Sequence, residues 1–299
     1  MDNRPEMNHE LSGLSTTSRQ TTKLVYTTIL QNGSQTTIHG NQMKIILSRK
    51  GFDSENGEQP SPILPDGTLL SLPIPSKNDS ITYSQLQHLN KSYFDIIHEL
   101  KPTTKIAPNY TCHLDPDIRS GLFGQEKAAQ GHLRKQGVGI NDIFIFFGWY
   151  RETEYHKSTL RYKPDAPDLH VMFGYLQVGK LFTAPNELPS YALSHPHASR
   201  FGNVNNCIYG ATERLTLDET KKGFGAFRFD RELILTKDGE NRSHWDLPDF
   251  FKKVDISYHR PESFKTGYFN SAKKGQEFVI DANDEIVSYF KNIICKDAT

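Results

Sequence analysis

Two long apolar runs rich in aromatic residues constrain the fold more than any other feature of this sequence. DIFIFFGWY covers residues 142–150 and LHVMFGYLQVGKLF covers residues 169–182, and a polar connection containing proline separates them. Runs of this composition predict two buried β-strands. Because successive side chains of a strand point to opposite faces, Phe147 and Trp149 lie on the face opposite Phe146. One of the two faces is therefore left for a ligand or for packing by helices.

The remaining pattern predicts an α+β protein. Shorter strand candidates are residues 43–48, 206–212, 232–237, 255–259 and 276–281. Apolar residues at helical spacing predict helices at 80–101, 124–135 and 285–294, and residues 245–251 predict one helical turn. Strands and helices do not alternate along the chain, which argues against a doubly wound sheet. We expect a mostly antiparallel or mixed curved sheet, open or closed into a small barrel, with about three flanking helices.

Composition excludes several classes of protein. The 299-residue chain carries 35 Lys+Arg and 35 Asp+Glu, so its formal net charge is zero. No bulk electrostatic attraction to nucleic acid is expected, although a local basic groove remains open. No apolar run approaches the ~20 residues that span a bilayer, so no membrane partner is expected. Cys112, Cys207 and Cys295 are widely spaced and lack a CxxC pair, which predicts reduced thiols in a cytoplasmic protein and no cysteine-based zinc site.

Residues 1–42 differ in composition from the rest of the chain. They are rich in Ser, Thr, Asn and Gln. This predicts either a disordered leader or an upstream extension of the reading frame, because Met43 directly precedes the first convincing strand. Residues 43–299 contain no clear Pro/Gly linker and are predicted to form a single domain.

A polar loop follows the first strand and offers groups that bind phosphate and bases. Ser48, Arg49, Lys50 and Asp53 stand in SRKGFD, before a stretch rich in proline. Arginine and lysine bind phosphate, and an aspartate can orient a hydroxyl or a base. A solvated loop with a salt bridge explains the same residues without any function. Neither a P-loop nor a dinucleotide-binding fingerprint is present.

Histidines and aspartates form two candidate clusters. In CHLDPDIR, His113, Asp115 and Asp117 alternate, so in an extended segment they share a face that suits a metal ion. A turn that caps the next helix is the alternative. In HPH, His195 and His197 flank a proline and can face one site, although the HExxH zinc pattern is absent. Structural or surface histidines are the alternative there.

The end of the first long run combines aromatic rings with a cation. In FFGWYRE, Phe147 and Trp149 precede Arg151. Such rings stack on a base while the arginine contacts its phosphate. Packing in the core is the alternative, since aromatic side chains dominate cores. No GxSxG elbow, kinase signature or Cys-His nucleophile pattern appears.

These segments, in this order, resemble the nucleotide-modification-associated domain 3 family over about residues 43–295. The resemblance rests on SRKGFDS, PSPILPDGTLLSLPIP, CHLDPDIR, FGQEKAAQGHL, GVGINDIFIFFGWYR, LHVMFGYLQVG, HPH, LTKDGENRSHWDLPDFF and GQEFVID. Two positions depart from the family pattern: Glu58 and Asn141 each stand where a glycine is expected. The two long runs are also similar to the strand pairs of PUA-like and EVE-like domains, small barrels that hold a modified or flipped base.

The resemblance implies a phage or prokaryotic protein linked to modification of nucleotides or DNA bases, with a nucleotide or base as its partner. It leaves the reaction, the cofactor and any metal open. The ligand-binding residues that we predict are Ser48, Arg49, Lys50, Phe147, Trp149, Arg151 and Trp245. The catalytic residues that we predict are Asp53, His113, Asp115, His195 and His197.

In this hypothesis the cations contact phosphate, the tryptophans stack on the base and Asp53 hydrogen-bonds its edge. The histidines and Asp115 supply acid/base chemistry or bind a metal. The SRKGFD loop is expected to line the same pocket as FFGWYR. Whether the protein is an enzyme stays open, because a non-catalytic reader of modified bases fits the same residues. A metal-dependent hydrolase acting on nucleotides or nucleic acid is a further alternative.

Overall fold

The fold is built on one large sheet. The computed structural model describes residues 42–273 and 275–296 of the chain. The strands of the sheet are β1 (Lys44–Arg49), β2 (Ser61–Ile63), β5 (Leu122–Gln125), β6 (Ile143–His156), β7 (Thr159–Tyr162), β8 (Leu169–Phe182), β9 (Cys207–Ala211), β12 (Phe224–Ala226) and β16 (Glu277–Asp281). Their order is β16-β1-β6-β8-β9-β5, with β12 paired to β8 and both β2 and β7 paired to β6.

The sheet is mixed and open. The two longest strands, β6 and β8, are antiparallel, whereas β1 is parallel to β6 and antiparallel to β16. The path ends at β16 on one side and at β5 on the other, so the sheet does not close on itself. The predicted α+β class with a mixed sheet is therefore confirmed, and the barrel alternative is not formed.

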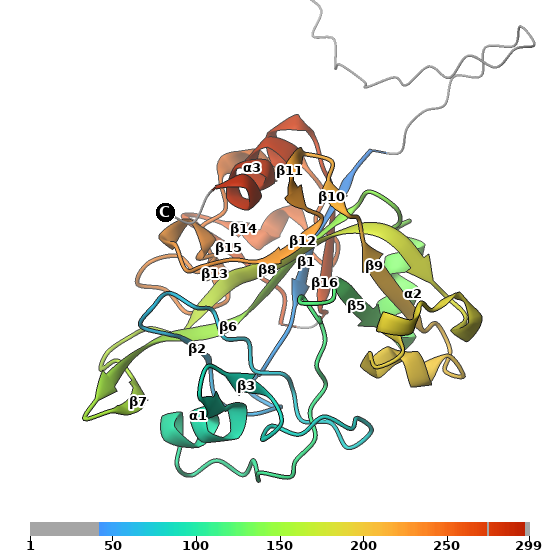
Figure 1. The fold of residues 1–299 in the computed structure, drawn as a ribbon. Coiled ribbons are helices and arrows are strands. Elements are labelled where there is room, and N and C mark those ends of the chain that lie inside the picture. The colour runs from blue at the N-terminus through green and yellow to red at the C-terminus, as the bar shows by residue number, and fades with distance from the viewer. Residues whose placement is uncertain (1–41, 274, 297–299) are drawn as a thin grey trace, which may run out of the picture. The chain divides into compact units, whose positions relative to one another are not determined.

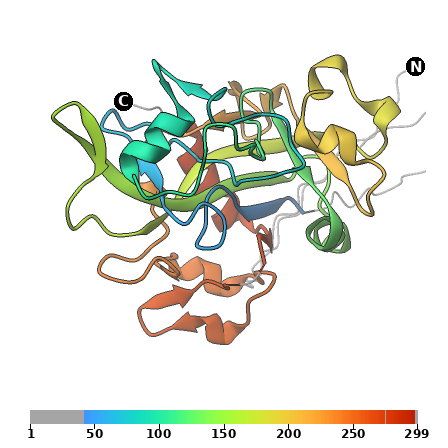
Figure 2. The same ribbon diagram turned by 90° about the horizontal axis from the view of Figure 1, so that it is seen from below.

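Helices and small sheets flank the large sheet. The α-helices in the described part of the chain are α1 (Tyr93–Leu100), α2 (Lys127–Lys135) and α3 (Asp284–Cys295). The small sheets join β3 (Gln87–His88) to β4 (Lys91–Ser92), β10 (Arg214–Leu215) to β11 (Asp218–Lys222), and β13 (His244–Trp245) and β14 (Phe264–Lys265) to β15 (Tyr268–Asn270). Short 3-10 helices are η1 (Pro185–Glu187), η2 (Ser190–Ala192), η3 (Pro196–Arg200), η4 (Arg231–Leu233), η5 (Asp249–Lys253) and η6 (Pro261–Ser263). Figures 1 and 2 show α1 and α3 on opposite sides of the large sheet.

Aromatic side chains cover both faces of β6. On one face, Phe144 and Phe146 pack against Phe123, with ring centroids 4.8 and 5.3 Å apart. On the other face, Phe147 packs edge-on against Trp245 at 5.1 Å. All five rings are fully buried. The central strands are thus buried on both sides, as their near-continuous apolar sequence requires.

The first helix is shorter than predicted. α1 begins at Tyr93, because Ser92 and Asp95 form a capping box that satisfies the backbone N–H groups at its start. Leu89, which fits the helical spacing, is 81% exposed and has a positive φ of 52°. The predicted start at residue 80 is therefore wrong. Apolar spacing continued upstream of the cap, but the chain there forms turns and the small β3–β4 pair.

Other predicted elements differ in detail. α2 begins at Lys127 rather than at residue 124, because the preceding residues pair with β9 as part of β5. The candidate strands at 232–237 and 255–259 form no strand and contribute only isolated bridges, such as Thr236 with Trp245 and Ile256 with Ile280. The last helix and the helical turn near residue 250 are present as α3 and η5.

No helix in the described part of the chain is long and apolar enough to span a bilayer. The predicted leader or extension at 1–42 lies outside the described residues, apart from Gln42. That residues 43–299 form a single domain stays a prediction.

Candidate metal centre

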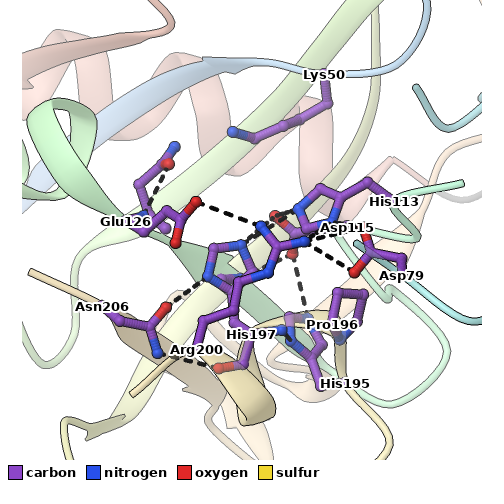
Figure 3. Close-up of polar contacts among 12 residues, drawn as sticks. Lys50, Asp79, His113, Asp115, Glu126, His195, Pro196, His197, Arg200 and Asn206 are labelled. Atoms are coloured by element: carbon purple, nitrogen blue, oxygen red, sulfur yellow. Dashed lines mark hydrogen bonds and ion pairs between the residues drawn. The ribbon is translucent and has the colours of Figure 1, made fainter. Parts of the chain in front are cut away.

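Two segments of the chain meet at the end of the sheet that β5 and β9 form. His113 and Asp115 precede β5, and His195 and His197 lie at the start of η3, which precedes β9. β5 pairs antiparallel with β9, and both strands pack against η3. The pairing therefore brings together side chains from two separate sequence motifs (Figure 3).

Three of these side chains surround one point. His113 Nε2 and His197 Nε2 are 3.2 Å apart, and each lies near Asp115 Oδ2, at 3.8 and 3.9 Å. A triangle with these sides has a circumradius of about 2.1 Å, so one position is about equally distant from all three atoms. Bonds from zinc to histidine nitrogen and carboxylate oxygen measure about 2.0–2.2 Å. The three atoms therefore fit a first-row divalent ion between them.

The ring of His197 is held in one orientation by Asn206. The Asn206 Nδ2 group donates to the backbone carbonyl of His197 at 3.0 Å, so the amide oxygen faces the ring. That oxygen lies 2.7 Å from His197 Nδ1, which must therefore carry a hydrogen and donate it. The lone pair of the neutral ring is then on Nε2, the atom that faces His113.

Asp79 holds His113 in the same way. His113 Nδ1 lies 3.0 Å from Asp79 Oδ2, and Arg200 Nη2 donates to both oxygens of the same carboxylate at 2.8 and 2.9 Å. Burial raises the pKa of Asp79, but hydrogen bonds from His113 and Ser76 and the Arg200 charge outweigh it and lower the pKa to about 2. An ionised carboxylate only accepts, so Nδ1 of His113 donates. Metal-binding histidines usually have such a partner on the second nitrogen.

Three ligand atoms face one another at the centre of the cluster. Burial lowers the pKa of His197 to about 4, with His113 and His195 adding to the effect and Asp115 and Asn206 opposing it. His197 is therefore neutral near pH 7, with its lone pair on Nε2. This atom, His113 Nε2 and Asp115 Oδ2 face the same point, and a cation at that point would be attracted by all three.

Asp115 is held by its other oxygen. Oδ1 accepts the backbone N–H of Gly124 at 2.8 Å, and His195 Nε2 lies 3.2 Å from it without hydrogen-bond alignment. Burial raises the pKa of Asp115, but His195, His197 and His113 together lower it well below the ordinary range. The carboxylate is thus ionised, and Oδ2 is left to face the two imidazoles.

His195 positions its neighbours rather than facing the central point. It caps η3, because its Nδ1 accepts the backbone N–H of His197 at 3.2 Å. Gly124 matters for a different reason: a Cβ at this position would lie 2.3 Å from the His197 ring. Only glycine allows β5 to approach η3 this closely.

Charged side chains lie around the cluster. Arg200 bridges Asp79 and Glu126, with Nη1 at 3.4 Å from the Glu126 carboxylate. Lys50 extends along one side of the cluster without a contact to it (Figure 3). Its ammonium pairs with the buried Glu277 at 2.8 Å and lies 4.5 Å from the centre of the Phe123 ring. Cationic and anionic groups therefore both stand near the point that the histidines face.

The ligand types favour a particular class of ion. Two imidazoles and one carboxylate suit Zn²⁺, Fe²⁺ and related ions, whereas Mg²⁺ and Ca²⁺ prefer sites made of oxygen atoms only. Structural zinc sites use four protein ligands, and catalytic ones keep a position open for water or substrate. In the described residues, the group of His, Cys, Asp and Glu side chains that could hold a metal contains three residues. A set of three would leave at least one coordination position open for water or another ligand.

The other predicted site residues lie elsewhere. Asp53 caps its own turn by accepting backbone N–H groups at 2.7 and 2.8 Å. Arg242 stacks on Trp149 at 4.1 Å, and Arg151 pairs with Asp168 at 2.6 Å. Burial lowers the pKa of Arg49, and the nearby charges of Asp53 and Arg242 also shift it, so these side chains lie close together.

The remaining predicted residues are buried. Phe147 and Trp245 are 0% exposed and pack against each other. Ser48 is also fully buried, and its hydroxyl has no partner among the described residues. Lys50 pairs with Glu277, whose charge also acts on Arg49, so both cations lie near the same carboxylate. That SRKGFD and FFGWYR line one pocket stays a prediction.

Sequence reasoning missed the residues that position the ligands. Arg200 lies in η3 together with His197, whereas Asp79, Asn206 and Gly124 lie in other segments of the chain. Gly124 gave one usable signal, since a glycine inside an apolar strand marks a close approach. Asp79 and Asn206 lie in polar segments whose composition is that of ordinary loops, so nothing distinguished them.

The comparisons with known proteins agree with the resemblance in the sequence. The family model described as nucleotide modification associated domain 3 matches residues 44–281. Searches of curated proteins and of solved structures gave no match. The matched region contains His113, Asp115, His197 and the residues that hold them, together with the whole path of the large sheet. The chain therefore belongs to the nucleotide modification associated domain 3 family.

Proposed function

We propose that this protein is a metal-dependent enzyme that acts on a nucleotide or on a base of nucleic acid. One observation carries the proposal: three ligand atoms lie about 2.1 Å from a common point, and a partner on the far nitrogen holds each histidine in the metal-binding orientation. Membership of the family supplies the link to nucleotide modification.

The chemistry follows from the ligand count. Three protein ligands leave positions free, where a divalent ion can polarise a phosphoryl or carbonyl oxygen or lower the pKa of a water molecule. Asp79 and Asn206 keep the two Nε2 atoms aimed inward, and Gly124 and His195 do the same for Asp115. Arg200, Glu126 and Lys50 stand near enough to contact substrate or to move protons. Hydrolysis of a nucleotide is the simplest reaction that this set supports.

The reader alternative has less support. A reader of modified bases needs an aromatic cage, but Phe147 and Trp245 are packed in the core and Arg242 covers one face of Trp149. A clustered pair of histidines with a buried carboxylate favours an enzyme. The free cysteines, two of them buried, are in keeping with the reducing cytoplasm that this proposal assumes.

Metal binding is the first test. The purified full chain is stripped with a chelator and titrated with Co²⁺, whose visible absorption reports its coordination, and with Zn²⁺ in competition. We expect about one equivalent to bind, and affinity to fall by more than about 100-fold in His113→Ala and His197→Ala. His98→Ala is the matched control, because His98 is exposed on α1, outside the cluster. Failure of the wild-type chain to bind Co²⁺ or Zn²⁺ would refute the metal centre.

Activity is the second test. The metal-loaded chain is incubated with nucleotides and with DNA, and the products are identified by mass spectrometry. The expected product appears with the wild-type chain and with His98→Ala but not with His197→Ala. A product formed equally by His197→Ala would show that another part of the protein carries the chemistry.

A further inference from the structure

A cleft of about 500 Å³ lies next to Asp115 of the candidate metal centre. Residues 68–71, 86–88, 114–119 and 224–226 line it, together with Tyr93, Phe173 and Lys222. Asp115 belongs both to this lining and to the candidate metal centre. The volume is in the range of sites that enclose small ligands and cofactors.

One part of the lining is apolar. Leu69, Leu70 and Leu86 contribute aliphatic side chains, and Tyr93 and Phe224 contribute rings. Phe224 is only half-buried, so part of its ring is free to contact a ligand. A flat heteroaromatic ring such as a nucleobase gains both burial and stacking against such a surface.

The other part of the lining is cationic. Arg119 and Lys222 are exposed at the cleft, and neither forms an ion pair within residues 42–273 and 275–296. His88 also lines the cleft, and its Nε2 is buried without a hydrogen-bond partner in the same ranges. Burial raises the pKa of Tyr93, and the charge of Arg119 opposes this, which places Arg119 near the apolar part.

The acidic groups of the cleft are already engaged. Asp115 contacts three histidines, and Asp117 accepts the backbone N–H of Ser120 at 3.4 Å. The ammonium of Lys222 lies 5.8 Å from the centre of the Phe224 ring. Arg119 and Lys222 both remain without an ion pair within the described ranges, and a group with several acceptor oxygens and negative charge satisfies both cations.

We propose that this cleft binds one free nucleoside monophosphate, with its base against the apolar part and its phosphate between Arg119 and Lys222. The segment from Asp115 to Arg119 runs along the cleft, so the nucleotide extends from the phosphate site toward the metal ligand. The inference rests on the proposed function in that it supplies the substrate of that metal centre. A free nucleotide is favoured over duplex DNA because the cleft has room for a small ligand and 35 Lys+Arg balance 35 Asp+Glu.

Calorimetry on the chelator-treated full chain tests this without depending on the metal. The ligands are the four deoxynucleoside monophosphates, the matching nucleosides and a short DNA duplex. We expect at least one monophosphate to bind, and the nucleoside without phosphate to bind at least about ten-fold more weakly. Arg119→Ala and Lys222→Ala are each expected to weaken binding of the monophosphate about ten-fold, and salt to weaken it further.

Arg134→Ala is the matched control, because Arg134 is an exposed cation on α2 outside the cleft. The variants change exposed side chains, so unchanged melting temperatures should confirm that they fold. The inference fails if no monophosphate binds, if Arg119→Ala and Lys222→Ala bind as well as Arg134→Ala, or if the duplex binds more tightly than every monophosphate.

The two proposals fail separately. His113→Ala is expected to lose the metal and to keep nucleotide binding, since His113 does not line the cleft. Nucleotide binding by a chain that takes up no metal would leave the cleft assignment standing and remove the metal centre. Metal uptake by a chain that binds no monophosphate would leave the metal centre standing and remove the cleft assignment.

Discussion

At the scale of single residues, the outer nitrogen of each imidazole decides whether the ring can serve as a metal ligand. A histidine ring that turns over presents a different atom to the centre. Asn206 prevents this for His197 through two hydrogen bonds, one to the ring and one to the backbone of the same residue. Asp79 does so for His113 with a carboxylate that Arg200 holds in place. Asn206 and Asp79 therefore set the ring orientations that metal binding requires.

Replacing Asn206 should therefore weaken metal binding without removing a ligand. In Asn206→Ala the His197 ring loses the acceptor for its Nδ1 hydrogen, and metal affinity is expected to fall about 10- to 100-fold. Competitive titration with Zn²⁺ measures the change. Asn203→Ala is the control, because Asn203 lies in the same loop but donates to Glu126 at 2.8 Å. Equal affinities for the two variants would contradict the assigned role.

His170 gives a pH dependence of stability away from the metal centre. Its ring is buried beside Trp245, whose indole N–H donates to His170 Nδ1 at 3.0 Å. Burial, and then the charges of Arg49 and Arg242, lower the pKa of His170 to about 3. The unfolded chain binds the proton near pH 6.5, so it takes up more protons than the folded chain between these values.

The contribution of His170 to stability is therefore constant above about pH 6.5 and is lost as the pH falls toward 3, by about 1.4 kcal/mol per pH unit. Urea unfolding of the wild-type chain and of His170→Gln, which keeps an acceptor for Trp245, measures this. The free energy of unfolding of the wild type, relative to the variant, should decrease from pH 7 to pH 4. A difference independent of pH would show that His170 titrates normally.

At the scale of elements, the chain adopts unusual backbone angles at two positions where the resemblance leads us to expect glycine. Glu58 has a φ of 56° and Asn141 a φ of 72°. Residues other than glycine are disfavoured at such angles, and asparagine is the least disfavoured of them. The two departures seen in the sequence therefore mark sites of positive φ. Their conformation is set by the surrounding turns rather than by the residue itself.

Glu58→Gly should stabilise the protein. Relief of the left-handed strain is expected to exceed the loss of two exposed ion-pair contacts, with Lys101 at 3.8 Å and Lys105 at 3.6 Å, and to raise the free energy of unfolding by about 0.5–1 kcal/mol. Asn141→Gly is the comparison, with a smaller effect because asparagine accepts this conformation. Chemical unfolding measures both. Destabilisation by Glu58→Gly would mean that the ion pairs outweigh the strain.

The sequence predicted elements well where composition alone decides them. β8 and the first half of β6 are apolar almost throughout, and α3 has an apolar stripe with a capping Asn283. The polar second half of β6, residues 151–156, lies beyond the predicted run. The predicted boundaries were wrong where a helix cap or pairing with a distant strand determines the element. α1 begins after its cap Ser92 rather than at residue 80, and the first residues of the predicted second helix belong to β5, which pairs with β9. Spacing within a segment carries no information on either effect.

At the scale of the whole molecule, the candidate metal centre depends on which distant segments the fold brings together. His113, Asp115 and His197 could each be named from short motifs. Their convergence could not be derived, because it results from the pairing of β5 with β9 and the packing of η3 on both. The outer partner of His113, Asp79, lies 34 positions from it, and that of His197, Asn206, lies nine positions from it. Short motifs in the sequence therefore indicate the candidate ligands but not that they meet at one point.

A metal bound between these segments should stabilise the fold as a whole. An ion that binds only the folded chain adds about 2.7 kcal/mol to the free energy of unfolding when its free concentration is 100 times its dissociation constant. We expect Zn²⁺ to raise the melting temperature of the wild-type chain by several degrees and to leave His197→Ala unchanged. A similar rise in both proteins would indicate that the ion binds elsewhere.

The position of β1 in the sheet also determines when the protein can finish folding. β1 lies between β6 and β16, and Lys44 and Asp281, which face each other across the β1–β16 pair, are 237 positions apart in the sequence. At translation rates of about 5–20 residues per second, roughly 10–50 s pass between their synthesis. During that time one edge of β1 has no partner and is open to wrong pairing. The ion pair between Lys50 and Glu277 also forms only then, so the surroundings of the histidine cluster are among the last parts of the protein to be completed on the ribosome.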